Sequence, residues 1–169
     1  MDRFVVLLAS ALLLAACSQP PPEPASEPAA QTLSIDSVIQ VADPKATAQL
    51  LKGFHVVEQG SWRWTEKHFS VALKPPIPGK PATLLLRFSI PDAVLKRLQT
   101  VTLGATVGGV ALPSQTYTQA GAQVYTQSVP ASALSGEKVQ VDFALDKALA
   151  PDENDRRELG VVVSSVGLE

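Results

Sequence analysis

The amino-acid sequence predicts an all-β domain, a β-sandwich of jelly-roll type with one short helix near its N-terminal side. Three observations predict this fold. From Gly53 onward, short runs rich in β-branched and aromatic residues follow one another, several of them alternate apolar with polar residues, and Gly, Pro and Ser clusters separate them. About eight or nine short strands with few helices are typical of sandwiches and jelly rolls.

The first strand and the clearest helix are expected before Gly53. Apolar residues within 33–39 indicate the strand. Asp43 followed by Pro44 is a combination that opens helices, because the aspartate side chain accepts from free backbone N–H groups and proline has no N–H to leave unpaired. The helix is expected to run through Leu51 and to stop at Gly53.

A hairpin is expected next, with Trp62 to Thr65 and Phe69 to Leu73 as its strands and Glu66-Lys67 as its turn. A second tight turn is expected at Gly108-Gly109, after a strand in which apolar residues alternate with Thr and Gly. The other elements are expected in this order: a strand over Thr83 to Ile90, a helical turn from Pro91 through Leu98, strands over Val101 to Val107, Val110 to Tyr117 and Gln123 to Val129, a connector over Ser132 to Gly136, a strand over Val139 to Ala144, a polar loop over Pro151 to Asp155, and a final run over Leu159 to Leu168.

The alternating runs also predict which side chains form the core, since residues two apart on a strand share a face. Three consecutive leucines at 84–86 leave the buried face ambiguous, and Leu85 is taken as the inward one. The side chains expected inside are those of Leu85, Phe88, Val101, Leu103, Val141, Phe143, Val161 and Val163.

The first 16 residues have the layout of a secretory signal peptide, with Arg3 before an apolar run from Phe4 to Leu14. The run has about 11 residues, whereas a spanning helix needs roughly 20. The following Leu14-Ala15-Ala16-Cys17 resembles the lipobox of bacterial lipoproteins, which implies that residues 1–16 are removed and that Cys17 is acylated. An ordinary signal peptide with a chance cysteine is the alternative. Ser18 is not the aspartate that commonly retains lipoproteins at the inner membrane, so the outer membrane, facing the periplasm, is expected if the source is Gram-negative.

Residues 17–31 are expected to be an acylated cysteine and a tether, and residues 32–169 the β-sandwich domain. Prolines stand at 20, 21, 22, 24 and 28, and no large apolar residue occurs from Ser18 to Gln31. Such a segment cannot bury enough surface to offset its ordering entropy, and its prolines keep it extended. At roughly 3 Å per residue it spans up to about 40 Å.

Charge and cysteine content exclude several partners and chemistries. The net charge of −2 comes without a basic block, so neither nucleic acid nor electrostatic attraction to anionic lipid is indicated, and the acyl chains are the expected link to the membrane. Cys17 is the only cysteine, so the domain has neither a disulfide nor a thiol nucleophile.

No catalytic or metal signature is found in the sequence, so no enzyme, metal or cofactor is predicted. His55 with Glu58 and Glu66 with His68 offer only two histidines, whereas zinc sites more often use three or four well-spaced ligands. The carboxylates of Asp152 and Asp155 are explained by a solvated acidic loop.

Two stretches stand out because they combine aromatic, charged and glycine residues. The first runs from Gly53 to Trp64 and holds both tryptophans of the chain, and the second runs from Asp155 to Gly160. Together they resemble galactose-binding-like β-sandwich domains of bacterial cell-surface polysaccharide proteins. The residues that carry the resemblance are Gly53, Phe54, Glu58, Arg63, Trp64, Asp155, Arg157, Leu159 and Gly160. The resemblance implies a fold more than an activity, because such sandwiches have many functions.

Two interpretations of these stretches stay open. In the structural one, the tryptophans are buried and Arg63 pairs with Glu58 or with Asp155 at the edge of the sandwich. In the functional one, a tryptophan stacks on a sugar ring and the charged groups bond its hydroxyls. The candidate ligand-binding residues are Glu58, Trp62, Arg63, Trp64, Asp155 and Arg157.

The sequence therefore predicts a lipid-anchored cell-envelope lipoprotein whose sandwich is a non-catalytic binding module for envelope glycan or polysaccharide. The alternative is a structural or assembly lipoprotein that binds another envelope protein through a strand edge or an apolar patch.

Overall fold

The computed structural model of the 169-residue chain describes residues 34–169. The signal peptide predicted for residues 1–16 and the acylated Cys17 and tether predicted for residues 17–31 lie outside the described residues. No helix within 34–169 is long and apolar enough to cross a membrane.

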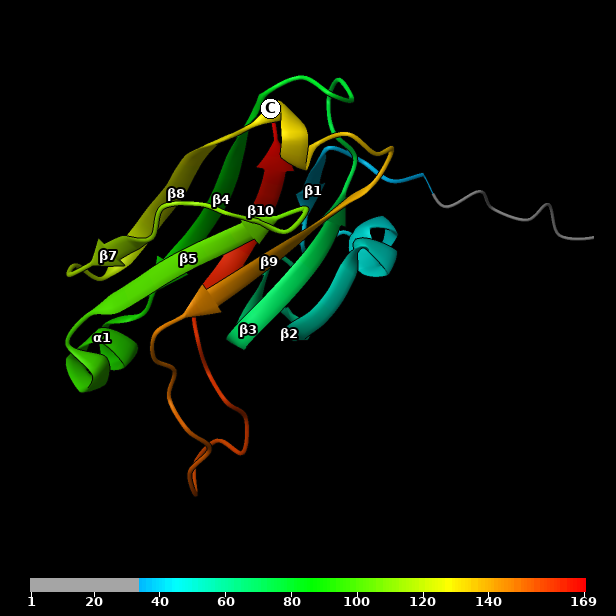
Figure 1. The fold of residues 1–169 in the computed structure, drawn as a ribbon. Helices are drawn as coiled ribbons and strands as arrows, with labels where there is room; N and C mark the ends of the chain where they lie inside the picture. Colours follow the sequence, from blue (N-terminus) through cyan, green and yellow to red (C-terminus); the bar gives the residue numbers. More distant parts are fainter. Residues whose placement is uncertain (1–33) are drawn as a thin grey trace, which may run out of the picture. The chain divides into compact units, whose positions relative to one another are not determined.

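The fold is the predicted all-β sandwich, and residues 34–169 form ten antiparallel strands and three short helical segments (Figure 1). In chain order the elements are β1 (Val38–Gln40), η1 (Pro44–Gln49), β2 (Leu50–Glu58), β3 (Trp62–Leu73), β4 (Ala82–Ile90), α1 (Asp92–Leu98), β5 (Val101–Val107), β6 (Val110–Ala111), β7 (Gln115–Tyr117), β8 (Gly121–Val129), η2 (Ala131–Ala133), β9 (Val139–Leu145) and β10 (Val162–Leu168).

All strands belong to one curled sheet in the order β6-β5-β9-β3-β10-β4-β8, with β1 on β10, β2 on β3 and β7 on β5. Strand β3 makes the corner of this sheet. Its residues 68–73 pair with β9, whereas Arg63 and Trp64 pair with β10. One long strand thereby joins both halves of the sandwich, and the core lies between them.

The core confirms seven of the eight side chains expected inside, among them Phe88, Val141 and Phe143. The prediction for Leu85 is wrong. Leu84 and Leu86 are fully buried and Leu85 is half-buried, because the pleat of β4 turns the even-numbered residues of this run to the core.

The helix predicted to run through Leu51 is shorter than expected. It is the 3₁₀ helix η1, and Leu50 already belongs to β2. Asp43 caps it as predicted, since its side chain accepts from the backbone N–H of Lys45 at 2.9 Å. Gly53 does not stop a helix but lies inside β2 at φ +73°, where a β-carbon would stand 2.1 Å from the carbonyl oxygen of His68, so only glycine fits beside β3.

The hairpin predicted around Glu66-Lys67 is also wrong, because β3 runs unbroken through both residues. Neither residue readily adopts the positive φ that tight turns need. Both instead continue the extended backbone of β3, with their side chains on opposite faces of the strand. The run predicted over Val110 to Tyr117 is divided into β6 and β7, since Pro113 between them has no N–H to offer a ladder.

Side-chain hydrogen bonds tie together parts of the sheet that have no ladder between them. At the two ends of the strand order, the hydroxyl of Tyr117 donates to the carbonyl of Val124 at 3.1 Å, and that of Tyr125 donates to the carbonyl of Pro113 at 2.7 Å. The side chain of Gln49 donates to the carbonyl of Asp36, just before β1, and to the carbonyl of Ala72, near the end of β3. These bonds close the sandwich along its sides.

Candidate functional site

Glu58, Asp155 and Arg157 meet at the end of the sandwich where β2 turns into β3. The guanidinium of Arg157 donates Nε and Nη2 to the two carboxylate oxygens of Asp155 at 3.0 and 2.8 Å, and Nη1 to Glu58 at 2.7 Å. Each of the three side chains is about one-third exposed. The structure thus brings together three of the six predicted ligand-binding residues, and their charged groups bond one another.

The electrostatics of this cluster follow from those bonds. The side-chain hydrogen bonds from Arg157 lower the pKa of Asp155 to about 2. The same contacts with Asp155, and then with Glu58, raise the pKa of Arg157. Both groups therefore stay charged in the folded protein over the whole ordinary pH range.

The two tryptophans lie beside this cluster on β3. Trp62 is the direct cross-strand partner of Glu58, and its ring packs edge-on against that of Trp64 with 6.5 Å between centroids. Trp64 also packs against the hydrophobic core, and both side chains are half-buried. Trp64 is therefore part of the packing, while Trp62 keeps some surface toward solvent.

Arg63 lies on the same strand but has different partners from those predicted. Its Nε donates to the carbonyl of Val41 at 2.7 Å and its Nη1 to the carbonyl of His55 at 3.0 Å. The expected pairing of Arg63 with Glu58 or Asp155 is wrong, since Arg157 makes those ion pairs. Arg63 instead ties the chain after β1 to the neighbouring β2.

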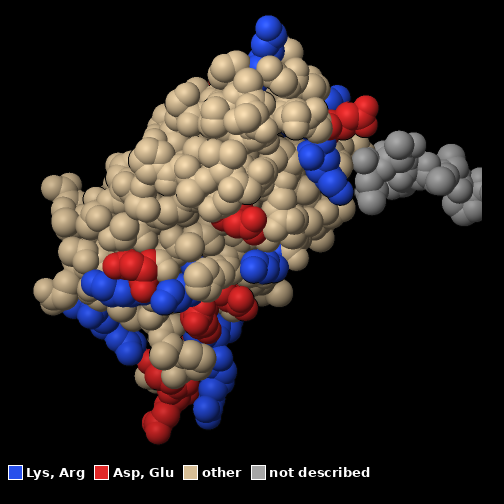
Figure 2. Space-filling model, viewed as in Figure 1, with Lys and Arg blue, Asp and Glu red and all other residues tan. Residues whose placement is uncertain are grey.

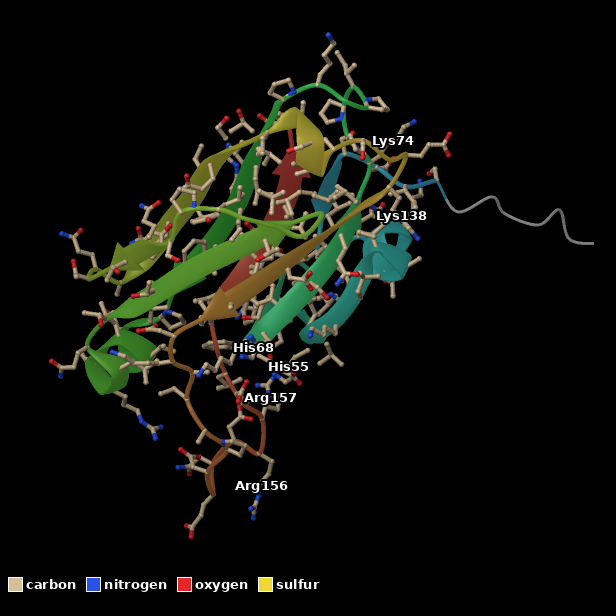
Figure 3. All side chains as sticks on the ribbon, viewed as in Figure 1. His55, His68, Lys74, Lys138, Arg156 and Arg157 are labelled. Carbon is tan, nitrogen blue, oxygen red and sulfur yellow. The ribbon has the colours of Figure 1, made fainter. Side chains whose placement is uncertain are left out.

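Charged side chains gather at this end of the molecule, around the loop between β9 and β10, while much of the rest of the viewed face carries no charge (Figure 2). Asp152 in this loop accepts from the backbone N–H groups of Asn154 and Asp155 and pairs with Arg97 of α1 at 3.1 Å. These bonds, the backbone ones first, lower the pKa of Asp152. Figure 3 shows Arg156 and Arg157 on the loop, below His55 and His68.

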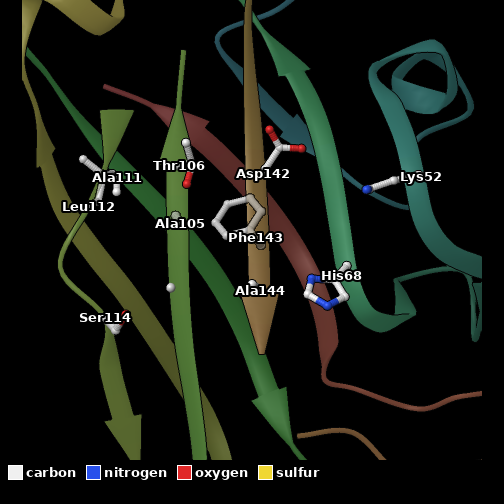
Figure 4. Close-up of a pocket in the computed structure, with 11 residues that line it drawn as sticks. Lys52, His68, Ala105, Thr106, Ala111, Leu112, Ser114, Asp142, Phe143 and Ala144 are labelled. Atoms are coloured by element: carbon white, nitrogen blue, oxygen red, sulfur yellow. The ribbon is translucent and has the colours of Figure 1, made fainter. Parts of the chain in front are cut away.

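A separate cleft of about 380 Å³ opens on the outer side of the sheet formed by β5, β9 and β3. Figure 4 shows Lys52, His68 and Asp142 on the sheet side of this cleft, with Ala111, Leu112 and Ser114 on the opposite border. Lys52 and His68 are exposed, and Asp142 is half-buried with Oδ1 accepting from the side chain of Gln140 at 2.8 Å.

The strand register produces this cleft. Gly104, Ala144 and His68 form one row across three strands, and Thr106 pairs with Asp142 in a parallel row. Gly104 and Ala144 in these rows have almost no side chain, so they form a flat floor for the cleft. The longer polar side chains beside them form its borders.

Gly104 also allows one border to come close. A β-carbon on Gly104 would stand 2.9 Å from the hydroxyl oxygen of Ser114, which belongs to the segment that crosses from β6 to β7. Glycine at this position therefore lets that segment lie against the sheet.

Sequence reasoning did not find this cleft. Lys52, His68 and Asp142 come from β2, β3 and β9 and share no motif. The predicted hairpin leaves His68 outside both of its strands, whereas His68 lies within the continuous β3. The alternation on β9 predicts that Asp142 points outward, but it does not say which residues stand beside it.

No group of three or more potential metal ligands of the His, Cys, Asp and Glu types occurs within residues 34–169. The nitrogen Nε2 of His55 lies 2.7 Å from the carbonyl oxygen of Glu158, and the Glu158 side chain accepts from the backbone N–H of Lys67 at 2.6 Å. His55 thus helps to hold the loop before β10 in place.

No protein-family model and no curated protein matches the sequence. Among solved structures, the chain is similar to a family 35 carbohydrate-binding module from an environmental isolate, with a TM-score of 0.50 at 12% identity over 78% of this chain and 91% of that chain. It is also similar, at lower TM-scores, to two family 36 modules. One is the CBM36-1 domain of a multidomain xylanase from the hindgut metagenome of Trinervitermes trinervoides, with a TM-score of 0.43 at 9% identity over 78% of this chain and 94% of that chain. The other is a CBM36 in complex with calcium and xylotriose, with a TM-score of 0.37 at 15% identity over 60% of this chain and 72% of that chain. The first likeness supports the sandwich fold.

Proposed function

We propose that the protein is a lipid-anchored envelope lipoprotein whose sandwich binds glycan without catalysis, and that the cleft over β5, β9 and β3 is its binding site. The observation that carries this proposal is the polar lining of the cleft. The ammonium of Lys52 donates hydrogen bonds and the carboxylate of Asp142 accepts them. The hydroxyl groups of Thr106 and Ser114 can do both. Sugar hydroxyls are both donors and acceptors, so a surface of this composition matches them.

The flat floor of the cleft also favours a sugar. Gly104 and Ala144 leave room for a ring to approach the sheet, and Leu112 adds an apolar contact at the border. The similarity to a family 35 carbohydrate-binding module is consistent with this function, although a likeness at 12% identity concerns the fold.

Binding is favoured over hydrolysis by the carboxylates. Glycoside hydrolysis commonly uses two carboxyl groups on either side of the scissile bond, roughly 5–10 Å apart. Among the described residues that line the cleft, Asp142 alone carries a carboxyl group. The cleft therefore lacks the acid and base pair that this reaction needs.

A glycan array with the lipid-free chain identifies the ligand, and variants then locate the site. We expect Asp142→Ala and Lys52→Ala each to weaken binding of the identified glycan by about tenfold or more, because each removes a charge-assisted hydrogen bond. Their melting temperatures should stay close to wild type, since neither side chain belongs to the core. Unchanged affinity in both variants would contradict the proposed site.

Matched controls are available in exposed residues away from the cleft. Glu153→Ala and Lys96→Ala remove the same charges and should leave glycan affinity unchanged. Trp62→Ala distinguishes the cleft from the cluster of Glu58, Asp155 and Arg157. A loss of affinity in that variant, measured at a temperature at which it is fully folded, would move the site to the cluster.

The lipid anchor is tested separately at Cys17. In a bacterial host, mass spectrometry should find a diacylglyceryl-modified Cys17 at the start of the mature chain, and Cys17→Ser should abolish lipid labelling, because the thioether requires sulfur. Detection of residues 1–16 on the mature protein would contradict the proposal.

A protein partner is the second candidate function. Strand β2 has β3 as its ladder partner on one side, and Leu51 and Val56 on it are 46% and 72% exposed. Three register irregularities along β2 weaken it as a template for another strand. Crosslinking in the native envelope would detect a protein bound at β2. Loss of that crosslink in Val56→Asp, with glycan binding retained, would favour this function.

A further inference from the structure

The loop between β3 and β4 presents an apolar tip at one end of the sandwich. Ile77 at this tip is 61% exposed, between Pro76 and Pro78, which are exposed as well. Lys74 and Lys80 lie on either side of the tip. Covering the exposed part of this side chain would be favourable, so the tip offers an apolar contact to a surface that can reach it.

This tip is fixed in place by backbone bonds. The N–H of Lys80 donates to the carbonyl of Ile77 at 3.2 Å, and the N–H of Gly79 donates to the carbonyl of Leu134 at 2.7 Å. The N–H of Lys74 donates to the carbonyl of Asp36 at 3.1 Å. The loop is thus tied to two other segments, so Ile77 is held out from the surface and does not fold back onto it.

The tip lies at the end of the domain where the described chain begins. Ser34 and Ile35 line one hollow together with Lys74, Pro76 and Lys138. Figure 3 shows Lys74 and Lys138 beside this starting point, and Arg156 and Arg157 at the opposite end. The first described residues, Ser34 and Ile35, therefore lie on the side of the tip.

We propose that the loop of Pro76, Ile77 and Pro78 contacts the lipid bilayer to which the domain is tethered, with Ile77 inserted at the boundary of headgroups and acyl chains. This inference rests on the proposed anchor at Cys17. The cations Lys74, Lys80 and Lys138 face phospholipid phosphates, while Glu137 and Glu169 at the same end offset much of that charge. The apolar tip therefore provides most of the attraction.

A single isoleucine is enough only because the domain is tethered. Burying its exposed part shifts an equilibrium by on the order of tenfold, which is too little to recruit a free protein. The predicted tether of residues 17–31 spans up to about 40 Å, which would hold the domain near the bilayer at an effective concentration in roughly the millimolar range. Under those conditions a weak contact sets the orientation and turns the cluster of Arg157 away from the membrane.

The test uses the single cysteine as a handle. A chain of residues 17–169, the predicted mature protein, contains every core residue found within residues 34–169. Cys17 of this chain is coupled to a maleimide phospholipid in phosphatidylcholine vesicles whose acyl chains are brominated, because bromine quenches tryptophan at the depth of the chains. Coupling attaches the domain whether or not the cell acylates Cys17, so failure of this test is distinct from failure of the proposed anchor.

Ile77→Trp is the reporter. We expect brominated lipid to remove about half or more of the fluorescence that this substitution adds, relative to unbrominated vesicles, if the tip is in contact most of the time. In the unsubstituted chain, Trp62 and Trp64 lie at the start of β3, and Ile77 follows its end. Brominated lipid should therefore change the fluorescence of these two tryptophans little. Val124→Trp is the matched control, because Val124 is an exposed apolar residue on β8 at the side of the sandwich.

Each outcome decides the proposal. Quenching confined to Ile77→Trp supports it, provided that this variant melts at the temperature of the unsubstituted chain. An unquenched Ile77→Trp on coupled vesicles overturns it. Equal quenching of Val124→Trp also overturns it, because contact would then be unspecific.

Discussion

Arg157 and Glu58 stand 99 positions apart in the chain and form an ion pair with 2.7 Å between Nη1 and Oε1. The pair fastens the start of the β2–β3 turn to the loop before β10. Asp155 completes it by binding the other two nitrogens of the same guanidinium. The pair between Arg157 and Asp155 is bidentate, whereas Glu58 receives a single hydrogen bond. Bidentate geometry is the arrangement in which a partly exposed ion pair contributes most.

The acid stability of the protein should depend on Asp155. Its pKa in the folded state is about 2, against an ordinary value of 3.8, so its contribution to stability is present above pH 4 and is lost as the pH falls toward 2. We expect the melting temperature of wild type to fall more steeply over this interval than that of Asp155→Asn. Melting curves of the two proteins at closely spaced pH values check it, and parallel profiles would contradict the assignment.

Arg63→Ala should lower the free energy of unfolding by about 1–3 kcal/mol, because the carbonyls of Val41 and His55 lose their charged donor. Arg63→Lys should cost less, since one ammonium can reach one of the two carbonyls. Urea denaturation measures both. Arg87→Ala is the control, because the Arg87 side chain is exposed on β4, and an equal loss in that variant would argue against the specific role of Arg63.

The two tryptophans should respond differently to truncation. Trp64→Ala removes a ring that packs against the core and should cost about 2–4 kcal/mol, somewhat below the range for fully buried rings. Trp62→Ala removes an edge contact with Trp64 and should cost about 1 kcal/mol. Chemical denaturation gives both values. Equal losses would show that Trp62 is also part of the core packing.

Tyr117 should limit stability in alkali. Burial, and then the neighbouring Tyr125, raise the pKa of Tyr117 to about 12 from 10.0. A raised pKa in the folded state means that the contribution is complete below pH 10 and is lost as the pH rises toward 12. Tyr117→Phe should cost about 1 kcal/mol at neutral pH through its lost bond to Val124, and should be less sensitive to alkali. Urea denaturation of both proteins between pH 9 and about pH 12 measures the free energy of unfolding. A difference in this free energy between wild type and variant that stays constant over the interval would refute the prediction.

Local pattern was sufficient for most of the strands. The alternation over Val101 to Val107 and Val139 to Ala144 predicted both the strands and their buried faces, because the period of two follows directly from the pleat. The turn at Gly108-Gly109 and the cap at Asp43 were likewise predicted from single residues with a specific backbone or hydrogen-bonding property.

Local pattern failed where a neighbour in space decides the outcome. Nothing near Glu66 and Lys67 shows that β3 continues past them to change partners from β10 to β9. The three leucines at 84–86 do not alternate with polar residues, so the sequence does not show which of them face the core. Packing in the folded sheet places Leu84 and Leu86 inside.

The sequence by itself determined the all-β class, most of the core and the presence of charged and aromatic residues at 58–64 and 155–157, since each depends on residues within a few positions of one another. Tertiary structure alone decided that Arg157, and not Arg63, pairs with Glu58 and Asp155. It also decided that Lys52, His68 and Asp142 border one cleft. The cleft depends on the register between strands far apart in the chain, where a shift of one residue would turn each bordering side chain to the other face. The ion pairs depend on where the loop between β9 and β10 lies against the end of β2, which no local pattern shows.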